Sequence, residues 1–116
     1  MFFLLLIQLG ISDLVSSKIA RNKVMVFSKS YCPHSTKAKN VFSKYILDGS
    51  LSPDDYEEME LDERKDGDQI QDYLLELTGA RTVPRVFVNG EFVGGGDDTV
   101  AKDKSGELRK LLGLNQ

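Results

Sequence analysis

The sequence predicts a small α/β domain in which a mixed four-stranded sheet is covered by helices on both faces. Two observations lead to this class. Short runs of β-branched and aromatic residues alternate with longer segments whose apolar residues recur at helical spacing. In addition, two of the short runs flank Asn89-Gly90, a pair typical of a tight β-hairpin. The predicted order is α-β-α-β-α-β-β-α, so a βαβ unit gives parallel strands and the hairpin gives antiparallel ones.

The first half of the chain contains two predicted helices and the first strand. A short helix is expected over residues 13–21, with Ser12 as its candidate N-cap. Residues 23–28, "KVMVFS", are short, apolar and β-branched, which is typical of a buried strand. The second helix is expected to begin near Pro33, because proline is favoured in a first helical turn, and to end at residues 48–50.

The second half completes the sheet. Residues 56–61, "YEEMEL", are the second predicted strand, and the helix after it ends at Gly79. The hairpin strands are expected over residues 85–89 and 91–93. The last helical region runs over residues 97–112, with a break near its Ser-Gly pair.

Composition describes an ordinary globular chain with an uneven charge. The chain has 116 residues, 41% hydrophobic and 28% charged, which suits one domain. The net charge of -3 favours neither nucleic acid nor an anionic membrane, and no nucleic-acid partner is expected. Residues 13–46 carry seven Lys/Arg and one Asp, whereas residues 54–72 carry ten acids against two bases. The basic part either favours a small anionic substrate or is, like the acidic part, a solvated face.

The first eleven residues, "MFFLLLIQLGI", are apolar and too short to span a bilayer as a helix. They are either the apolar region of a secretory signal or an extension of a domain that comprises residues 12–116. No Lys or Arg precedes the apolar run, which argues against a signal. A cytoplasmic location is expected, with the secretory pathway as the alternative.

Cys32 is the only cysteine, which excludes an intramolecular disulfide and a zinc site of several thiolates. It follows a predicted strand and directly precedes a helix. The unpaired N–H groups and the dipole at a helix start stabilise a thiolate, and Lys29 adds positive charge. We therefore expect an exposed thiol with a lowered pKa, suited to attack on a disulfide. The alternative is a buried structural cysteine.

Three stretches together resemble the glutaredoxin family: "FSKSYCPHS", "TGARTVPRVFVNGEFVGG" and "GGDD". The resemblance runs from about residue 12 to the C-terminus. It implies a thioredoxin-like fold, glutathione as co-substrate, and reduction of protein–glutathione mixed disulfides with Cys32 as nucleophile. It also implies glutathionylated proteins as partners, and glutathione reductase indirectly through oxidised glutathione. A monomer without metal is expected.

The resemblance also implies a glutathione site. Val83-Pro84 is expected to be a cis peptide facing Cys32, and the start of the last helical region is expected to hold the γ-glutamyl carboxylate. Without the family, the proline suits a strand start, the two aspartates suit helix capping, and Gln71 suits an exposed helix position. The residues that the resemblance assigns to glutathione are Lys29, Tyr31, Gln71, Thr82, Val83, Pro84, Gly95, Gly96, Asp97 and Asp98.

The active-site motif Cys32-Pro33-His34-Ser35 departs from the dithiol members, which carry a second cysteine where this chain has Ser35. His34 stands in place of the usual tyrosine and is expected to contact substrate or solvent. A cycle that needs one thiol remains open to this chain. The Ser35 hydroxyl either bonds the Cys32 sulfur or belongs to an ordinary first-turn residue.

The sequence also bears on two functions other than that of the enzyme. A pair of chains, each with a glutathione, is able to hold a [2Fe–2S] cluster as a carrier or sensor. Pro33 argues against this, because the cluster-binding members are better matched by glycine or serine there. A glutathione transferase would need a second, helical domain.

Overall fold

A four-stranded sheet in the order β2-β1-β3-β4 forms the middle layer of the molecule. The computed structural model describes residues 2–114, apart from the side chains of residues 2–5 and 8. β1 (Val24–Ser28) pairs parallel with β2 (Tyr56–Glu60) and antiparallel with β3 (Arg85–Val88). β3 continues through the hairpin into β4 (Glu91–Gly94). The predicted mixed sheet is confirmed.

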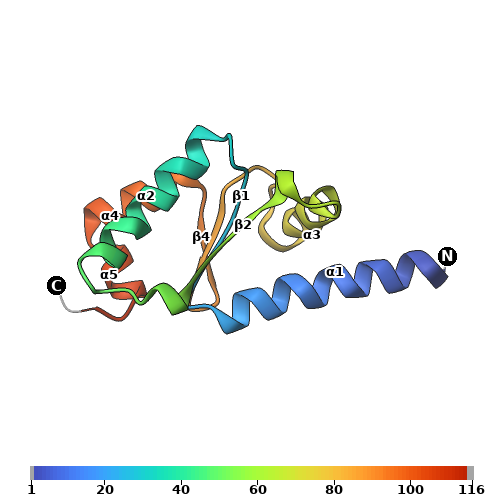
Figure 1. Cartoon of the computed structure of the whole chain (residues 1–116), viewed down its shortest axis with the longest axis horizontal. Coiled ribbons are helices and arrows are strands. Elements are labelled where there is room, and N and C mark those ends of the chain that lie inside the picture. Colours follow the sequence, from blue (N-terminus) through green and yellow to red (C-terminus); the bar gives the residue numbers. More distant parts are fainter. Residues whose placement is uncertain (1, 115–116) are drawn as a thin grey trace.

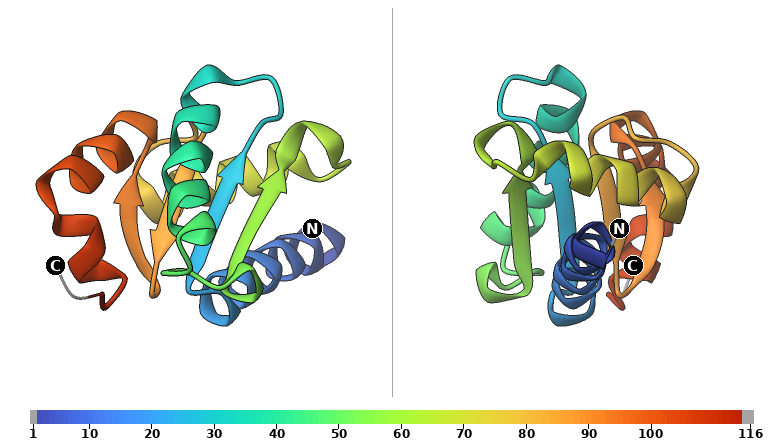
Figure 2. Two further views of the ribbon diagram at one scale, coloured as in Figure 1. Left: turned by 60° about the vertical axis from the view of Figure 1, so that its left-hand side comes forward. Right: turned by 90° about the vertical axis from the view of Figure 1, so that its right-hand side faces the viewer.

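Helices cover both faces of this sheet, as predicted (Figures 1 and 2). On one face lie α2 (Pro33–Leu47), α4 (Gly96–Ser105) and α5 (Glu107–Leu111). On the other face lie α1 (Phe2–Arg21) and α3 (Gly67–Thr78). α4 and α5 are separated at the glycine between them, which has a φ of 85° and confirms the predicted break.

Alternation along the strands divides the apolar residues into two cores. Val24 and Val26 of β1 face α2, whereas Met25 and Phe27 face α1 and α3. The α2 side contains Ala38, Val41, Phe42, Tyr45, Leu51, Val86, Val88, Val93, Leu108 and Leu112, and the α1 side contains Ile11, Val15, Met59, Leu61, Ile70, Leu74 and Phe87. Helices and apolar side chains therefore pack against both faces of the sheet, which fixes the positions of the strand ends.

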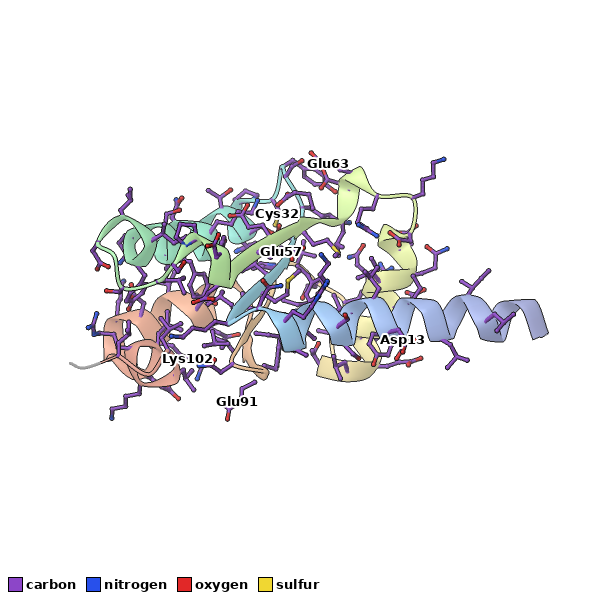
Figure 3. All side chains as sticks on the ribbon, turned by 60° about the horizontal axis from the view of Figure 1, so that its bottom comes forward. Asp13, Cys32, Glu57, Glu63, Glu91 and Lys102 are labelled. Atoms are coloured by element: carbon purple, nitrogen blue, oxygen red, sulfur yellow. The ribbon has the colours of Figure 1, made fainter. Side chains whose placement is uncertain are left out.

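α1 is longer than the helix expected over residues 13–21, because it continues back to Phe2. Ile11 and Val15 are buried against the sheet side, whereas Leu6 and Leu9 are each 52% exposed. The first turns of α1 therefore project beyond the body (Figures 1 and 3). No helix in the described part of the chain combines the length and the apolar content that crossing a membrane requires.

β2 forms one outer edge of the sheet and carries three acids in its five residues. Glu57 pairs with Lys18 of α1 at 2.8 Å, and Glu60 pairs with Lys39 of α2 at 2.8 Å. Glu58 is exposed and accepts a hydrogen bond from a tyrosine hydroxyl. These ion pairs fasten the outermost strand to a helix on each face.

Two short 3₁₀ helices flank β2: η1 (Pro53–Asp55) and η2 (Leu61–Glu63). Neither was predicted, because a single turn is too short to produce an apolar period. η2 brings an aspartate beside the loop that follows β1, as described below.

Candidate active site

Cys32 follows the turn after β1 and is the N-cap residue of α2. The turn before it is closed by a hydrogen bond of 3.1 Å from the Cys32 N–H to the Lys29 carbonyl oxygen. Pro33 occupies the first turn of α2, as expected. The cysteine is partly exposed, which excludes the buried structural alternative.

The surroundings of Cys32 favour its ionised form. Partial burial acts against ionisation, but the N–H groups of Ser35 and His34, the Ser35 hydroxyl and the Lys29 charge outweigh it. The pKa of the Cys32 thiol therefore lies below its ordinary value. These N–H donors belong to the start of α2, where the helix leaves them without intrahelical partners. The lowered pKa expected from the sequence is confirmed.

Ser35 uses one hydroxyl for two contacts. It is fully buried, and its Oγ accepts a hydrogen bond from the Lys29 N–H at 3.3 Å. Its hydroxyl also helps to stabilise the Cys32 thiolate and so lowers the pKa of that thiol. Ser35 is thus more than a plain first-turn residue, because it ties the active-site loop and the sulfur to α2.

The segment before β3 lies against the sulfur. The Val83–Pro84 peptide is cis, as the resemblance implied. The Cys32 thiol donates toward the Val83 carbonyl oxygen at 3.7 Å. Thr82, just before, is exposed and its Oγ1 accepts a hydrogen bond from the Arg85 guanidinium at 3.2 Å.

The start of α4 forms the next wall of the site. Gly95 is the N-cap, and its N–H donates to Asp98 Oδ2 at 3.0 Å. Asp98 therefore caps α4 without any ligand, as a capping residue would. Its other carboxylate oxygen has no hydrogen bond in the described structure. Asp97 is exposed and pairs with Lys37 of α2 at 3.2 Å.

Gly96 brings the start of α4 directly onto the active-site turn. A Cβ at this position would lie 2.4 Å from the carbonyl oxygen of His34, a distance that backbone atoms do not tolerate. The residue must therefore be glycine for the two helix starts to meet. The imidazole of His34 is on an exposed residue, as expected.

Lys29 and Gln71, both assigned to glutathione by the resemblance, differ in exposure. Lys29 is partly exposed, whereas Gln71 is only 4% exposed and donates from Nε2 to the Arg81 carbonyl oxygen at 2.8 Å. The exposed-helix reading of Gln71 is wrong, because a loop carbonyl folds over it. Arg81 itself pairs with Asp72 at 3.1 Å. Tyr31 is 71% exposed beside the cysteine.

Sequence reasoning missed Asp62 of η2. Its Oδ1 accepts a hydrogen bond from the Ser30 N–H at 2.9 Å, and its Oδ2 accepts one from the Ser30 hydroxyl. These bonds, first the hydroxyl and then the N–H, hold the pKa of Asp62 below its ordinary range, with a further contribution from the Lys29 charge. Asp62 therefore clamps the loop that carries Cys32. In the sequence it was one of ten acids in a run, and nothing distinguished it.

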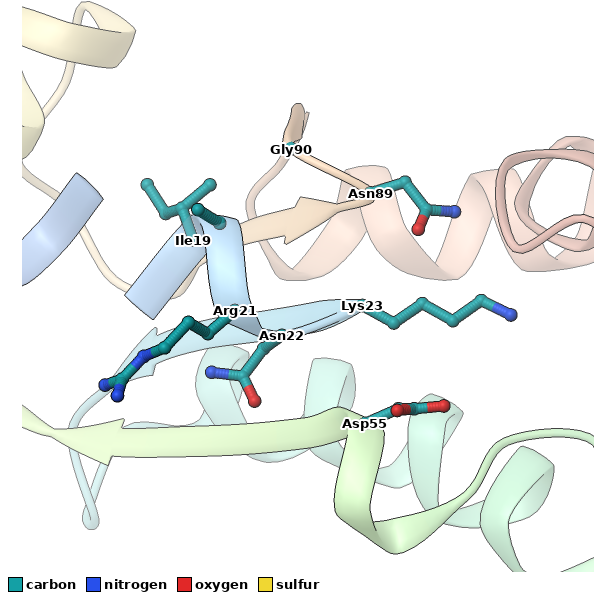
Figure 4. A pocket seen from close by; sticks show the side chains of 8 residues that line it. Ile19, Arg21, Asn22, Lys23, Asp55, Asn89 and Gly90 are labelled. Atoms are coloured by element: carbon teal, nitrogen blue, oxygen red, sulfur yellow. The ribbon is translucent and has the colours of Figure 1, made fainter. Parts of the chain in front are cut away.

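A cavity of about 560 Å³ lies at the other end of the sheet, where β1 begins and the hairpin turns. Its lining includes Arg21, Lys23, Asp55 and Asn89. Figure 4 shows the side chains of Arg21 and Lys23 pointing away from each other, so they do not converge on one ligand. The lining of this cavity contains no cysteine, serine or histidine.

Among the residues that the structure describes, no group of three His, Cys, Asp or Glu side chains is arranged to hold a metal ion.

Comparison with known proteins gives a consistent result. Residues 24–93 match the family model Glutaredoxin. The chain is 50% identical over 109 residues to Glutaredoxin-C4 of Arabidopsis thaliana, which covers 90% of this chain and 72% of that protein. It is 47% identical over 105 residues to Monothiol glutaredoxin-S6 of Oryza sativa subsp. japonica, with 90% and 75% covered.

A solved structure supports the same relation. The buckwheat glutaredoxin–glutathione complex is 35% identical, has a TM-score of 0.80, and matches 90% of this chain and 89% of that chain. The thioredoxin-like fold that the resemblance implied is confirmed by this likeness.

Proposed function

The chain belongs to the glutaredoxin family, and on this premise we propose that it reduces protein–glutathione mixed disulfides by a monothiol mechanism with Cys32 as nucleophile. At the family level the protein is a glutathione-dependent thiol oxidoreductase. The proposal adds the substrate class and the use of a single thiol. Its main support is that a cysteine with a lowered pKa stands at the start of α2, while a buried serine occupies the position of a second thiol.

The proposed cycle has two exchanges. In the first, the Cys32 thiolate attacks the glutathione sulfur of the substrate disulfide, a new S–S bond forms to glutathione, and the protein leaves as a thiolate that takes up a proton. In the second, the thiolate of a free glutathione attacks the glutathione sulfur on Cys32. Oxidised glutathione leaves and the Cys32 thiolate is restored. One disulfide is reduced and one is formed, so the electrons balance.

The residues around the sulfur supply partners for each part of glutathione. The backbone N–H and C=O of Val83, beside the sulfur, pair with the cysteinyl part of the ligand. The first turn of α4 receives the γ-glutamyl carboxylate, since anions favour a helix N-terminus. The unoccupied oxygen of Asp98 faces the ligand amine. Lys29 provides the cation for the glycine carboxylate, and Gln71 holds the main chain at Arg81 in place.

This arrangement explains why the Cys32 thiolate attacks the glutathione sulfur of the mixed disulfide rather than the sulfur of the protein partner. The tripeptide is held along its whole length, whereas the protein part of the substrate meets only the exposed Tyr31 and His34. A held glutathione presents its sulfur to Cys32 each time, which orients the reaction. Different protein partners then react through the same step.

The test is a glutathione-coupled assay on a glutathionylated peptide with glutathione reductase as the reporting enzyme. We expect turnover by the natural chain and by Ser43→Ala, an exposed substitution on α2, and none by Cys32→Ala. Turnover by Cys32→Ala at the natural rate would refute the nucleophile. Both variants are checked for folding by circular dichroism.

A second measurement tests the monothiol mechanism. When the peptide is supplied without free glutathione, we expect mass spectrometry to find one glutathione bound per chain, on Cys32. A peptide with an internal disulfide should be reduced much more slowly than the glutathionylated one. Equal rates, or no adduct on Cys32, would contradict the monothiol cycle while leaving the family assignment in place.

A further inference from the structure

Arg85, the first residue of β3, is a buried cation without an anion. It is 9% exposed and lies on the α3 side of the sheet, with its guanidinium 5.0 Å from the centroid of the Phe92 ring. Among the carboxylates of residues 6–114, none forms an ion pair with it. A guanidinium stays protonated in proteins, and leaving such a charge buried without a partner is costly.

Its hydrogen bonds go only to neutral oxygens. Nε donates to the Pro84 carbonyl oxygen at 3.2 Å, and Nη2 donates to Thr82 Oγ1 at 3.2 Å. Nη1 donates to Thr78 Oγ1 at 3.4 Å. A guanidinium has five N–H groups, so this set leaves part of its capacity unused. The bonds to residues 82 and 84 fall on both sides of Val83, whose carbonyl oxygen faces the Cys32 sulfur.

The guanidinium also lies beneath the start of α4. A Cβ on Gly95 would lie 3.5 Å from Nη2 of Arg85 and 3.7 Å from the Pro84 carbonyl oxygen. Burial lowers the pKa of Arg85, and the charge of Asp98 opposes this shift. Asp98 is therefore the acid that acts on Arg85, but it remains beyond ion-pair distance while it caps Gly95.

We propose that Arg85 is a positioning residue for glutathione: it braces the segment on both sides of Val83, and the γ-glutamyl carboxylate of the bound ligand is its missing counter-charge. This inference rests on the proposed function, because it assumes that the γ-glutamyl end binds at the first turn of α4. The ligand does not need to touch the buried guanidinium, since water and salt screen a charge interaction less when one of the charges is buried. Glutathione binding then brings a negative charge near a cation that has no ion-pair partner in the described chain.

The test uses S-methylglutathione, which has no free thiol, in nuclear magnetic resonance titrations of the natural chain and its Arg85 variants. Arg85→Gln removes the charge, and Arg85→Met removes the charge but keeps the stem on Phe92. We expect either variant to bind S-methylglutathione more weakly than the natural chain, with a dissociation constant on the order of tenfold higher. Arg85→Lys, which keeps the charge, should recover most of the loss. Of Arg85→Gln and Arg85→Met, the variant whose spectrum shows a folded protein is compared with the natural chain.

Esters of the ligand separate charge from shape. The diethyl ester of S-methylglutathione carries neither carboxylate, whereas the glycyl monoethyl ester keeps the γ-glutamyl one. We expect removal of the Arg85 charge to weaken the binding of the glycyl monoester on the order of tenfold as well. The binding of the diester should weaken by less than about twofold. Equal weakening of all three ligands would show a merely structural role, and no weakening would remove Arg85 from binding; either result overturns the inference.

The peptide assay distinguishes failure of the Arg85 inference from failure of the proposed function. A natural chain that turns over the glutathionylated peptide and binds S-methylglutathione retains its proposed function whatever the Arg85 variants do. A natural chain that binds none of the three ligands would instead refute the glutathione site itself.

Discussion

Replacing Ser35 by alanine should raise the pKa of Cys32, because it removes the hydroxyl that helps to stabilise the thiolate. A hydrogen bond to a charged group contributes about 1.5–3 kcal/mol. One pKa unit corresponds to about 1.4 kcal/mol, so the loss is worth about one to two units. The N–H groups of Ser35 and His34 and the charge of Lys29 remain in the variant. We therefore expect the lower end of the range, about one unit.

The rate should fall by less than the thiolate fraction. Below the pKa, a rise of one unit reduces the thiolate about tenfold, but a more basic thiolate is a better nucleophile, with a Brønsted slope of about 0.5. The net loss in the rate of attack on a glutathionylated peptide is therefore about threefold at a pH below both pKa values. Above both values the variant should be about threefold faster than the natural chain, because its thiolate is more basic.

The pKa is measured from the ultraviolet absorbance of the thiolate, or from the pH dependence of alkylation of Cys32. Thr36→Ala is the matched control, because its hydroxyl lies one residue further along α2 and bonds the Cys32 carbonyl oxygen at 3.3 Å rather than the sulfur. We expect the control to titrate like the natural chain. Superimposable titrations of Ser35→Ala and the natural chain would refute the assigned role of the hydroxyl.

The same pKa has a consequence for stability. Since the folded pKa of Cys32 is depressed, the folded state favours the thiolate. The resulting stabilisation is present above the unfolded pKa, about 8.5, and is lost as the pH falls through the folded pKa. Ser35→Ala should show a smaller rise in melting temperature across that interval.

Three further predictions concern charge. Lys29→Glu should raise the apparent KM for glutathione several-fold with little change in kcat, whereas Lys110→Glu, an exposed control on α5, should not; equal KM values would remove Lys29 from the site. Asp62→Asn should keep one acceptor for Ser30 but lose charge assistance, so amide exchange of the loop before Cys32 should accelerate; unchanged exchange would contradict the clamp. Burial, with help from the Asp103 carboxylate, raises the pKa of Tyr45 to about 12, so stability should fall as the pH rises from about 10 toward that value. Tyr45→Phe should make this decline shallower in pH-dependent denaturation, and Tyr56, whose pKa burial also raises, accounts for the part that remains.

The sheet and most helices could be predicted because their signals are local. The apolar period of α2 and the Asn89-Gly90 turn each lie within a few residues. The full length of α1 could not be predicted in this way, because residues 2–11 are apolar on all sides and give no helical period. A uniformly apolar run does not distinguish a helix from an irregular extension.

The site was predictable where the chain itself carries the chemistry and not where distant segments meet. Cys32 at a strand–helix junction indicates a lowered pKa from position alone. Asp62 bonds a residue that lies 32 positions away, and no spacing in the sequence predicts such a contact. Gln71 is polar and was expected at the surface, but a loop carbonyl satisfies it and allows it to be buried. Arg85 was predicted only as a strand position, because burial of a cation depends on the whole fold.

The outer strand β2 also has a consequence for solubility. One side of its backbone has no strand partner, and such an edge invites pairing with another chain. Glu58, which has no lysine partner in the described structure, would approach the acids of another copy if two of these edges met, and that repulsion opposes fibril-like stacking. Acidification that neutralises these acids should therefore promote aggregation through this edge.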